Sequence, residues 1–164
     1  MPRLGILGMF VAAVLIAPLG ASSANAQSAL QGEAAKRFVG TWRIVSITTD
    51  GKTNEMRGPR PTGLIIYDAG GNMAVQIMPD RPRPKFAAAE PTPDEAKVAL
   101  YGYTAYFGTY SVDALPGTVT HHRQGNINPG GLGDFVRRYE FVGGDKLILR
   151  PLENQHQLVW ERVK

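Results

Sequence analysis

The chain has 164 residues, a length that suits one domain built around a single hydrophobic core. It contains no cysteine, which excludes disulfide bonds, cysteine nucleophiles and cysteine metal ligands. The formal net charge is +4, and the arginines are scattered instead of forming a basic helix or stripe, so the pattern argues against a nucleic-acid partner.

Residues 1–26 have the pattern of a secretory signal peptide. Arg3 precedes the apolar run 4–19, and Ala24-Asn25-Ala26 forms a small-residue cleavage site. A retained membrane anchor is the alternative, but the run is short and is broken by a proline and a glycine near its end. We therefore expect cleavage after Ala26, no membrane span after processing, and a mature domain of residues 27–164 in the periplasm or outside the cell.

The mature part begins with a helical pattern and continues as strands. Apolar residues recur at roughly helical spacing over 27–38, which predicts a short N-terminal helix. The segments that follow are rich in β-formers or alternate between apolar and polar residues, and glycine-containing turns separate them. The expected strands are 39–49, 63–68, 72–78, 107–112, 117–124, 135–141, 146–150 and 157–163. In the first of them, one face is expected to hold Trp42, Ile44, Ser46 and Thr48.

Two segments interrupt this series of strands. Residues 79–93 hold five prolines, which exclude a central strand and predict a long surface loop, either a lid over a cavity or a passive insertion. Thr92 and Pro93 are followed by Asp94 and Glu95, the pattern of a capped helix start, so a short helix is predicted from 93 toward 103.

The strand count predicts the fold class. About eight short strands without a strand–helix alternation favour an all-β, antiparallel up-and-down barrel or sandwich, with a short N-terminal helix and one short internal helix. Closure into a barrel removes exposed sheet edges, and eight strands leave an interior wide enough for one small ligand. The lumen is therefore the expected binding site.

Three stretches carry a family resemblance. Gly40-Thr41-Trp42 follows the expected helix and resembles the start motif of lipocalins. Residues 103–122, with Tyr-Phe-Gly-Thr-Tyr and Gly-Thr-Val-Thr-His-His, and the ending 158–163 resemble the middle and the end of the small bacterial and fungal lipocalin-like domains. The resemblance spans nearly all of 27–164.

This resemblance implies a calycin-type, eight-stranded barrel that holds a small apolar or amphipathic molecule, while some barrel relatives isomerise or cyclise theirs. It also implies an arginine near the end of the last strand that packs across the first-strand tryptophan. Arg162 is the matching position, so Gly40, Trp42 and Arg162 are expected to close one end of the barrel.

The side chains that face the lumen follow from the alternation of apolar residues. His121 points inward with the valine two positions before it, and His122 points outward. Arg137 and Tyr139 share an inward face on the next strand, and Tyr110 faces inward on the preceding one. Neighbouring strands should therefore bring Tyr110, His121 and Arg137 close together.

A histidine and an arginine below aromatic walls can orient a carboxylate, an enolate or a phenol. The alternative is a buried hydrogen-bond network that satisfies only its own members. Tyr106 can serve packing, ligand contact or both. The candidate ligand-binding residues are Tyr106, Tyr110, His121, Arg137 and Tyr139, and no catalytic residue is identified.

Other chemistries lack support in the sequence. Adjacent strand residues point to opposite faces, so His121 and His122 do not form a metal site, and no cofactor motif is present. Serine hydrolysis is disfavoured because there is no Gly-x-Ser-x-Gly motif and because Ser46 and Ser111 have no evident base partner.

Three functions of different classes remain open. The favoured one is an exported carrier of a small apolar or amphipathic molecule. The second is a cofactor-independent isomerase or cyclase that acts on such a molecule in the same lumen. The third is a structural or interaction protein with a filled core, and the sequence identifies no protein partner.

Overall fold

The computed structural model describes residues 20–164, so most of the expected signal peptide lies outside the described residues. Helix α1 leads into a series of strands, which helix α2 interrupts between β4 and β5. The elements are α1 (Gly20–Phe38), β1 (Gly40–Thr49), β2 (Lys52–Thr53), β3 (Thr62–Tyr67), β4 (Asn72–Met78), α2 (Pro93–Leu100), β5 (Thr104–Asp113), β6 (Thr118–Asn126), β7 (Gly133–Val142), β8 (Lys146–Pro151) and β9 (His156–Arg162). No helix within residues 20–164 has the length and apolar character needed to cross a membrane.

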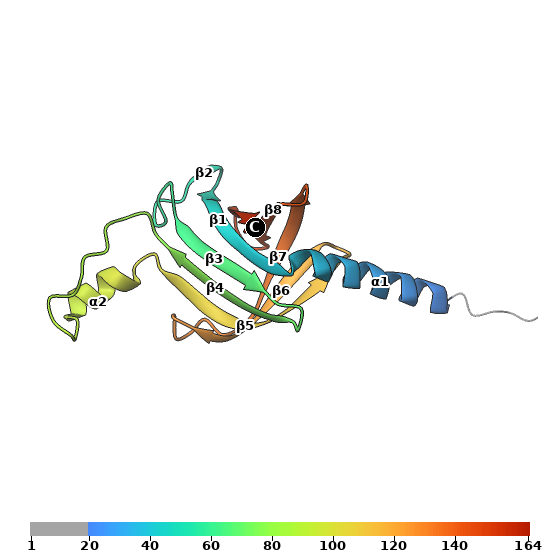
Figure 1. The fold of residues 1–164 in the computed structure, drawn as a ribbon, viewed down its shortest axis with the longest axis horizontal. Helices are drawn as coiled ribbons and strands as arrows, with labels where there is room; N and C mark the ends of the chain where they lie inside the picture. The colour runs from blue at the N-terminus through green and yellow to red at the C-terminus, as the bar shows by residue number, and fades with distance from the viewer. Residues whose placement is uncertain (1–19) are drawn as a thin grey trace, which may run out of the picture.

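The sheet closes into an antiparallel up-and-down barrel (Figure 1). Strands β3 to β9 pair in chain order, and β1 pairs with both β3 and β9, so eight strands form the barrel. The ninth strand, β2, has two residues and pairs antiparallel with the last two residues of β1. The expected barrel is therefore confirmed. The short strand β2 was not expected, and helix α1 begins at Gly20, ahead of the predicted segment.

A β-bulge in β1 corrects the expected face of this strand. The register against β9 runs from Ile44 opposite Trp160 to Ser46 opposite Val159, which leaves Val45 as an extra residue. The alternation shifts by one at this point, so Ile47 is buried with Trp42 and Ile44, where Ser46 and Thr48 were expected to share their face. The bulge thereby delivers an apolar side chain to the lumen.

The end of the barrel next to α1 is filled by aromatic rings. Phe38, the last residue of α1, is fully buried, and its ring centroid lies 5.2 Å from that of Tyr67 and 5.0 Å from those of Tyr139 and Phe141. Trp42 is also fully buried and donates its indole N–H to the carbonyl of Phe38 at 2.8 Å. Burial of these large rings closes one end of the barrel.

Arg162 holds this closed end together. Its guanidinium lies 4.0 Å from the Trp42 ring and donates to the carbonyls of Arg37 at 2.7 Å and Val39 at 2.8 Å, which belong to the end of α1 and the residue after it. Gly40 has φ +133°, and a Cβ at this position would lie 2.8 Å from Arg162 Nη1. Gly40, Trp42 and Arg162 therefore lie together at this end of the barrel, and their role in closing it stays a prediction.

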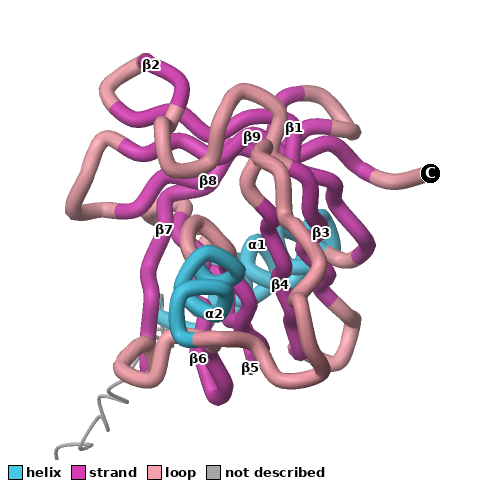
Figure 2. Tube along the Cα trace, turned by 90° about the vertical axis from the view of Figure 1, so that its left-hand side faces the viewer, coloured by secondary structure: helices cyan, strands magenta, loops and turns pink. Residues whose placement is uncertain are grey.

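The two helices lie at opposite ends of the barrel (Figure 1), and α2 stands in front of the lumen when the barrel is viewed from the α2 end (Figure 2). Thr92 and Glu95 form the expected capping box, but α2 buries none of its residues. Two arginines of the loop before α2 stack on tyrosine rings that follow the helix. The Arg81 Cζ lies 4.5 Å from the centroid of the Tyr101 ring, and the Arg83 Cζ lies 4.8 Å from that of Tyr103. This end of the barrel is not filled by a helix.

Candidate functional site

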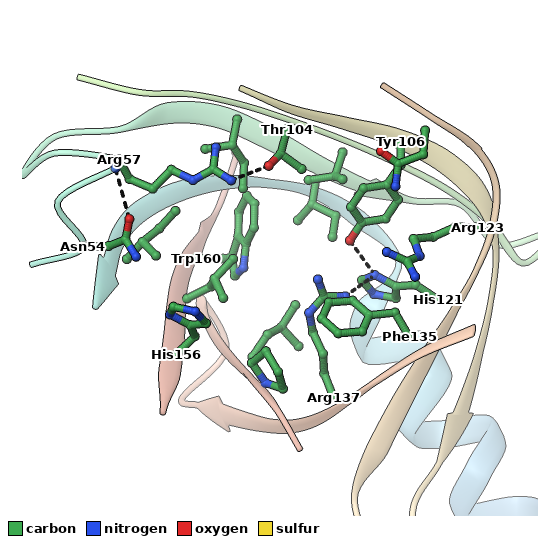
Figure 3. Close-up of a pocket in the computed structure, with 18 of the residues that line it drawn as sticks. Asn54, Arg57, Thr104, Tyr106, His121, Arg123, Phe135, Arg137, His156 and Trp160 are labelled. Atoms are coloured by element: carbon green, nitrogen blue, oxygen red, sulfur yellow. Dashed lines mark hydrogen bonds between the residues drawn. The ribbon is translucent and has the colours of Figure 1, made fainter. Parts of the chain in front are cut away.

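A cavity of about 320 Å³ occupies the barrel lumen (Figure 3). Its wall is mainly apolar and is formed by Ile47, Ile65, Val75, Ile77, Phe135, Leu149, Leu158 and Trp160. Polar side chains from loops and strand ends line it as well, namely Asn54, Arg57, Thr104, Asn126, Asn128, Asn154 and His156. The lumen thus combines an apolar wall with a polar rim, the usual composition of a small-molecule site.

His121 lies at the floor of this cavity, where its imidazole is fully buried and hydrogen bonded on both nitrogens. Tyr67 Oη lies 2.7 Å from Nε2, and Tyr106 Oη lies 2.9 Å from Nδ1. Arg137 Nη1 lies 2.6 Å from the same Nδ1. Because a guanidinium can only donate, Nδ1 accepts this bond, and we assign the imidazole proton to Nε2, which donates to Tyr67.

Burial lowers the pKa of His121 well below its ordinary value, and the positive charge of Arg137 lowers it further. His121 is therefore neutral at physiological pH. Burial also raises the pKa of Tyr67 well above its ordinary value, so this hydroxyl stays protonated. The floor of the cavity is consequently a network of neutral groups around one cation, Arg137.

Strand register explains how these side chains meet. His121 on β6 is paired with Phe135 on β7, and Arg137 follows Phe135 by two residues, so all three face the lumen. Tyr106 reaches the same point from β5. Tyr67 comes from β3, which is not a neighbour of β6, so its bond to His121 spans the lumen and separates the cavity from the aromatic rings around Phe38.

Arg137 has an unusual environment for a buried cation. Only 6% of the residue is exposed, and its Cζ lies 4.0 Å from the centroid of the Phe135 ring. None of the ion pairs among residues 20–164 includes Arg137. Its Nε and the Nε1 of Trp160 are the buried side-chain polar atoms that lack a hydrogen-bond partner within those residues. Both are donors.

Two more arginines line the cavity. The Arg123 Cζ lies 5.0 Å from the Phe135 ring, and its Nε donates to the carbonyl of Gly133 at 3.2 Å. Arg57 donates to the carbonyl of Gly102 and to the Thr104 hydroxyl, and burial, followed by the nearby charge of Arg81, lowers the pKa of this guanidinium. Among residues 20–164, the cavity lining therefore holds three arginines and no Asp or Glu.

The structure divides the five predicted site residues into two groups. Tyr106, His121 and Arg137 line the cavity and contact one another. Tyr110 and Tyr139 lie among the aromatic rings of the closed end instead, because Tyr110 stacks against Tyr67 at 4.8 Å and donates to the carbonyl of Asp68 at 2.9 Å, while Tyr139 packs on Phe38. Tyr110 is paired with His121 in the β5–β6 register, but its ring lies at the closed end instead of in the cavity. Ligand binding by any of these residues stays a prediction.

Sequence reasoning did not name Tyr67, Phe135, Trp160 or Arg57 as site residues. Alternation in β7 predicts Phe135 on the same inward face as Arg137, and alternation in β3 would have placed Tyr67 inside the barrel. The hydrogen bond from Tyr67 across the lumen has no local signal in the sequence. Arg57 lies in a loop, where the period of two does not apply.

A second polar network lies on the outside of the barrel and corrects the expectation that Ser111 has no base partner. Ser111 Oγ is 2.9 Å from His122 Nε2, and His122 Nδ1 is 2.6 Å from Asp134 Oδ1. This is the order of a serine hydrolase triad. The residues sit within regular antiparallel pairing of β5, β6 and β7, and none of them lines the cavity. This triad therefore lies outside the lumen cavity.

A family model described as a lipocalin-like domain matches residues 39–163, which comprise all eight strands of the barrel. The match begins after α1, at the residue before the strand that carries Trp42. No curated protein matches the chain with significant similarity.

Proposed function

Because the chain belongs to the lipocalin-like domain family, we propose that it binds a small, partly apolar molecule inside its barrel. A lipocalin-like barrel fits a binding protein in general, and the cavity is the observation that carries the proposal. The aromatic rings around Phe38 close one end, and the apolar wall faces a rim of asparagine, arginine and histidine side chains. A molecule with an apolar body and a polar group would satisfy both surfaces.

The cavity volume suggests one ligand at a time. Ligand pockets in proteins commonly measure about 300 to 1,000 Å³, and this cavity, at about 320 Å³, lies at the lower limit. Bulky or branched ligands should therefore bind poorly, whereas a slender molecule should fit.

Fluorescence titration with phenylnaphthylamine, a neutral probe that brightens in apolar surroundings, tests the proposal. Val75 lines the cavity, and its neighbour Gln76 lies exposed on the outer face of the same strand. Val75→Phe should therefore abolish the fluorescence increase by filling the lumen, and Gln76→Phe should leave it unchanged. No increase with the parent protein, or equal loss in both variants, would contradict binding in the lumen.

The isomerase or cyclase alternative has no observation in its favour. Acid–base catalysis needs a group that can exchange a proton with the ligand. Both nitrogens of His121 are already hydrogen bonded within the protein, and its pKa is lowered by burial. The third alternative, a filled core, is at odds with the cavity above His121.

We also propose that residues 1–26 direct export to the periplasm or the medium, on the strength of the signal-peptide pattern in the sequence. Residues 24–30 of α1 are exposed, and Phe38 is the one described side chain of this helix that is buried. Cleavage after Ala26 would therefore preserve the closed end. N-terminal sequencing of the exported protein should begin at Gln27, and an intact Met1 in the membrane fraction would contradict export.

A further inference from the structure

We infer that the molecule bound in the cavity carries a carboxylate and that Arg137 binds this group at the cavity floor. The inference rests on the proposed function and specifies the chemical class of its ligand. It is drawn from the hydrogen-bonding state of Arg137, from the balance of charge in the lining and from the unpaired donor on Trp160.

Arg137 has a buried donor on its guanidinium that no other described residue pairs with. Nη1 is occupied by His121, whereas Nε has no hydrogen-bond partner among residues 20–164. Nε shares an edge of the planar group with Nη2, and the two N–H bonds on that edge are parallel. Two parallel donors match the two oxygens of a carboxylate, so this edge can form the bidentate pair that arginine makes with such anions.

The charge of Arg137 also calls for an anion. A buried cation without a counter-charge is costly, and here the Phe135 ring and the lone pair of His121 supply only partial compensation. Arg57 and Arg123 add positive charge to the same lining, which contains no acidic side chain. The positive charge of the lining should therefore attract an anionic ligand and repel an ammonium group.

Trp160 provides a second donor in the same cavity. Its Nε1 is buried without a partner among the described residues, and an indole N–H can only donate. Both unpaired buried atoms of the lining, Arg137 Nε and Trp160 Nε1, are therefore donors. They require acceptor atoms from whatever fills the lumen, which a carboxylic acid with an additional oxygen would supply.

His121 acts as a positioning residue in this arrangement. It is neutral, and its Nδ1 accepts from Arg137 at 2.6 Å, so it fixes the guanidinium without cancelling its charge. A glutamate or aspartate in the same place would neutralise Arg137 and remove the need for an external anion. Figure 3 shows His121 bonded to both Tyr106 and Arg137. Because the imidazole is neutral, the charge of Arg137 remains for a ligand to compensate.

The test compares decanoate, decanol and decylamine, which share one apolar chain and differ in head group. Each is titrated against the phenylnaphthylamine complex by competition, or directly by calorimetry. Decanoate should bind about 10- to 100-fold more tightly than decanol, the factor expected for a hydrogen bond to a charged group, and decylamine should bind most weakly.

Arg137→Met and Arg138→Met form a matched pair of variants, because the two arginines are neighbours on β7 and Arg138 is exposed on the outer face. Arg137→Met should reduce decanoate affinity to that of decanol and leave decanol binding unchanged. Arg138→Met should preserve the preference for decanoate. Trp160→Phe retains a smaller aromatic ring and removes the N–H, and it should weaken decanoate binding less than Arg137→Met does.

Thermal unfolding in the absence of ligand separates this role from a structural one. Tyr106 remains beside His121 Nδ1 when Arg137 is removed, so Arg137→Met should unfold at the temperature of the parent or above it. If this variant fails to fold, the relative affinities of the three ligands for the parent protein test the inference instead. Equal binding of decanol or decylamine, or a folded Arg137→Met with full decanoate affinity, would overturn the inference and leave the proposed function standing. Failure of all the probes to bind would instead contradict the proposed function.

Discussion

The Arg162 guanidinium stacks on the Trp42 ring, with 4.0 Å between the Arg162 Cζ and the ring centroid. The same guanidinium donates to the carbonyls of Arg37 and Val39, so one side chain connects the last strand, the first strand and the end of α1. We therefore expect barrel closure and helix docking to depend on each other through this pair.

Trp42→Ala should lower the free energy of unfolding by about 3 to 5 kcal/mol, because it removes a fully buried ring from a packed barrel end. Arg162→Ala should also destabilise the protein, through lost packing on Trp42 and lost bonds to two carbonyls. Urea denaturation measures both. Unfolding midpoints equal to that of the parent in both variants would show that this pair does not secure the closed end.

Gly40→Ala should destabilise the protein by about 1 to 3 kcal/mol, since a side chain at a positive φ is strained and must displace a neighbour. Gly40 has φ +133°, and the new Cβ would lie 2.8 Å from Arg162 Nη1. Gly144→Ala is the control, because nothing lies within 4 Å of a Cβ there. Similar unfolding midpoints for the two variants would argue against this close approach.

The burial of His121 predicts a dependence of stability on pH. The pKa of His121 in the folded protein lies well below the ordinary value of 6.5. Below pH 6.5 the unfolded chain therefore binds a proton at this residue that the folded protein does not bind. Stability should be unaffected by this group above pH 6.5 and should decline below it, by at most about 1.4 kcal/mol per pH unit.

Urea denaturation between about pH 5 and pH 8 measures this effect. His121→Gln cannot titrate, so its stability should decline less between pH 6.5 and pH 5 than that of the parent. A parent slope that survives in His121→Gln would mean that another group is responsible.

The external network around Ser111 should be chemically inert. A serine triad gains about 10²- to 10³-fold in rate from a single preorganised oxyanion donor, and Ser111 lies in regular strand pairing outside the cavity. A fluorophosphonate probe should therefore leave the protein unlabelled, as judged by intact mass. Labelling that disappears in Ser111→Ala would instead reveal a reactive serine on the outer face.

The alternation of residues in the sequence predicts which side chains face the lumen, but not how far along the barrel axis each side chain lies. The structure places His121 inside and His122 outside because a strand alternates with a period of two, and the sequence alone contains that information. Tyr110 is paired with His121, yet its ring lies at the closed end. The position of a side chain along the barrel axis depends on strand tilt and on side-chain direction, which alternation does not specify.

Features that depend on contacts between distant residues could not be predicted from the sequence either. The extra residue Val45 moves Ile47 into the lumen, and only its pairing with β9 reveals the bulge. The bond from Tyr67 to His121 joins strands that are not neighbours. The family resemblance supplied the role of Arg162, which neither charge nor periodicity would have indicated.

The most direct measurement for a ligand in the lumen is a set of intermolecular nuclear Overhauser contacts between the methyl groups of the protein and the tighter of the two probes, phenylnaphthylamine or decanoate. We predict contacts to Val75, Ile77 and Leu149 on the cavity wall. The exposed methyl groups of Leu64 and Ile66 on the outer face serve as the internal control. Contacts confined to that outer pair, or none to the wall, would contradict binding in the barrel.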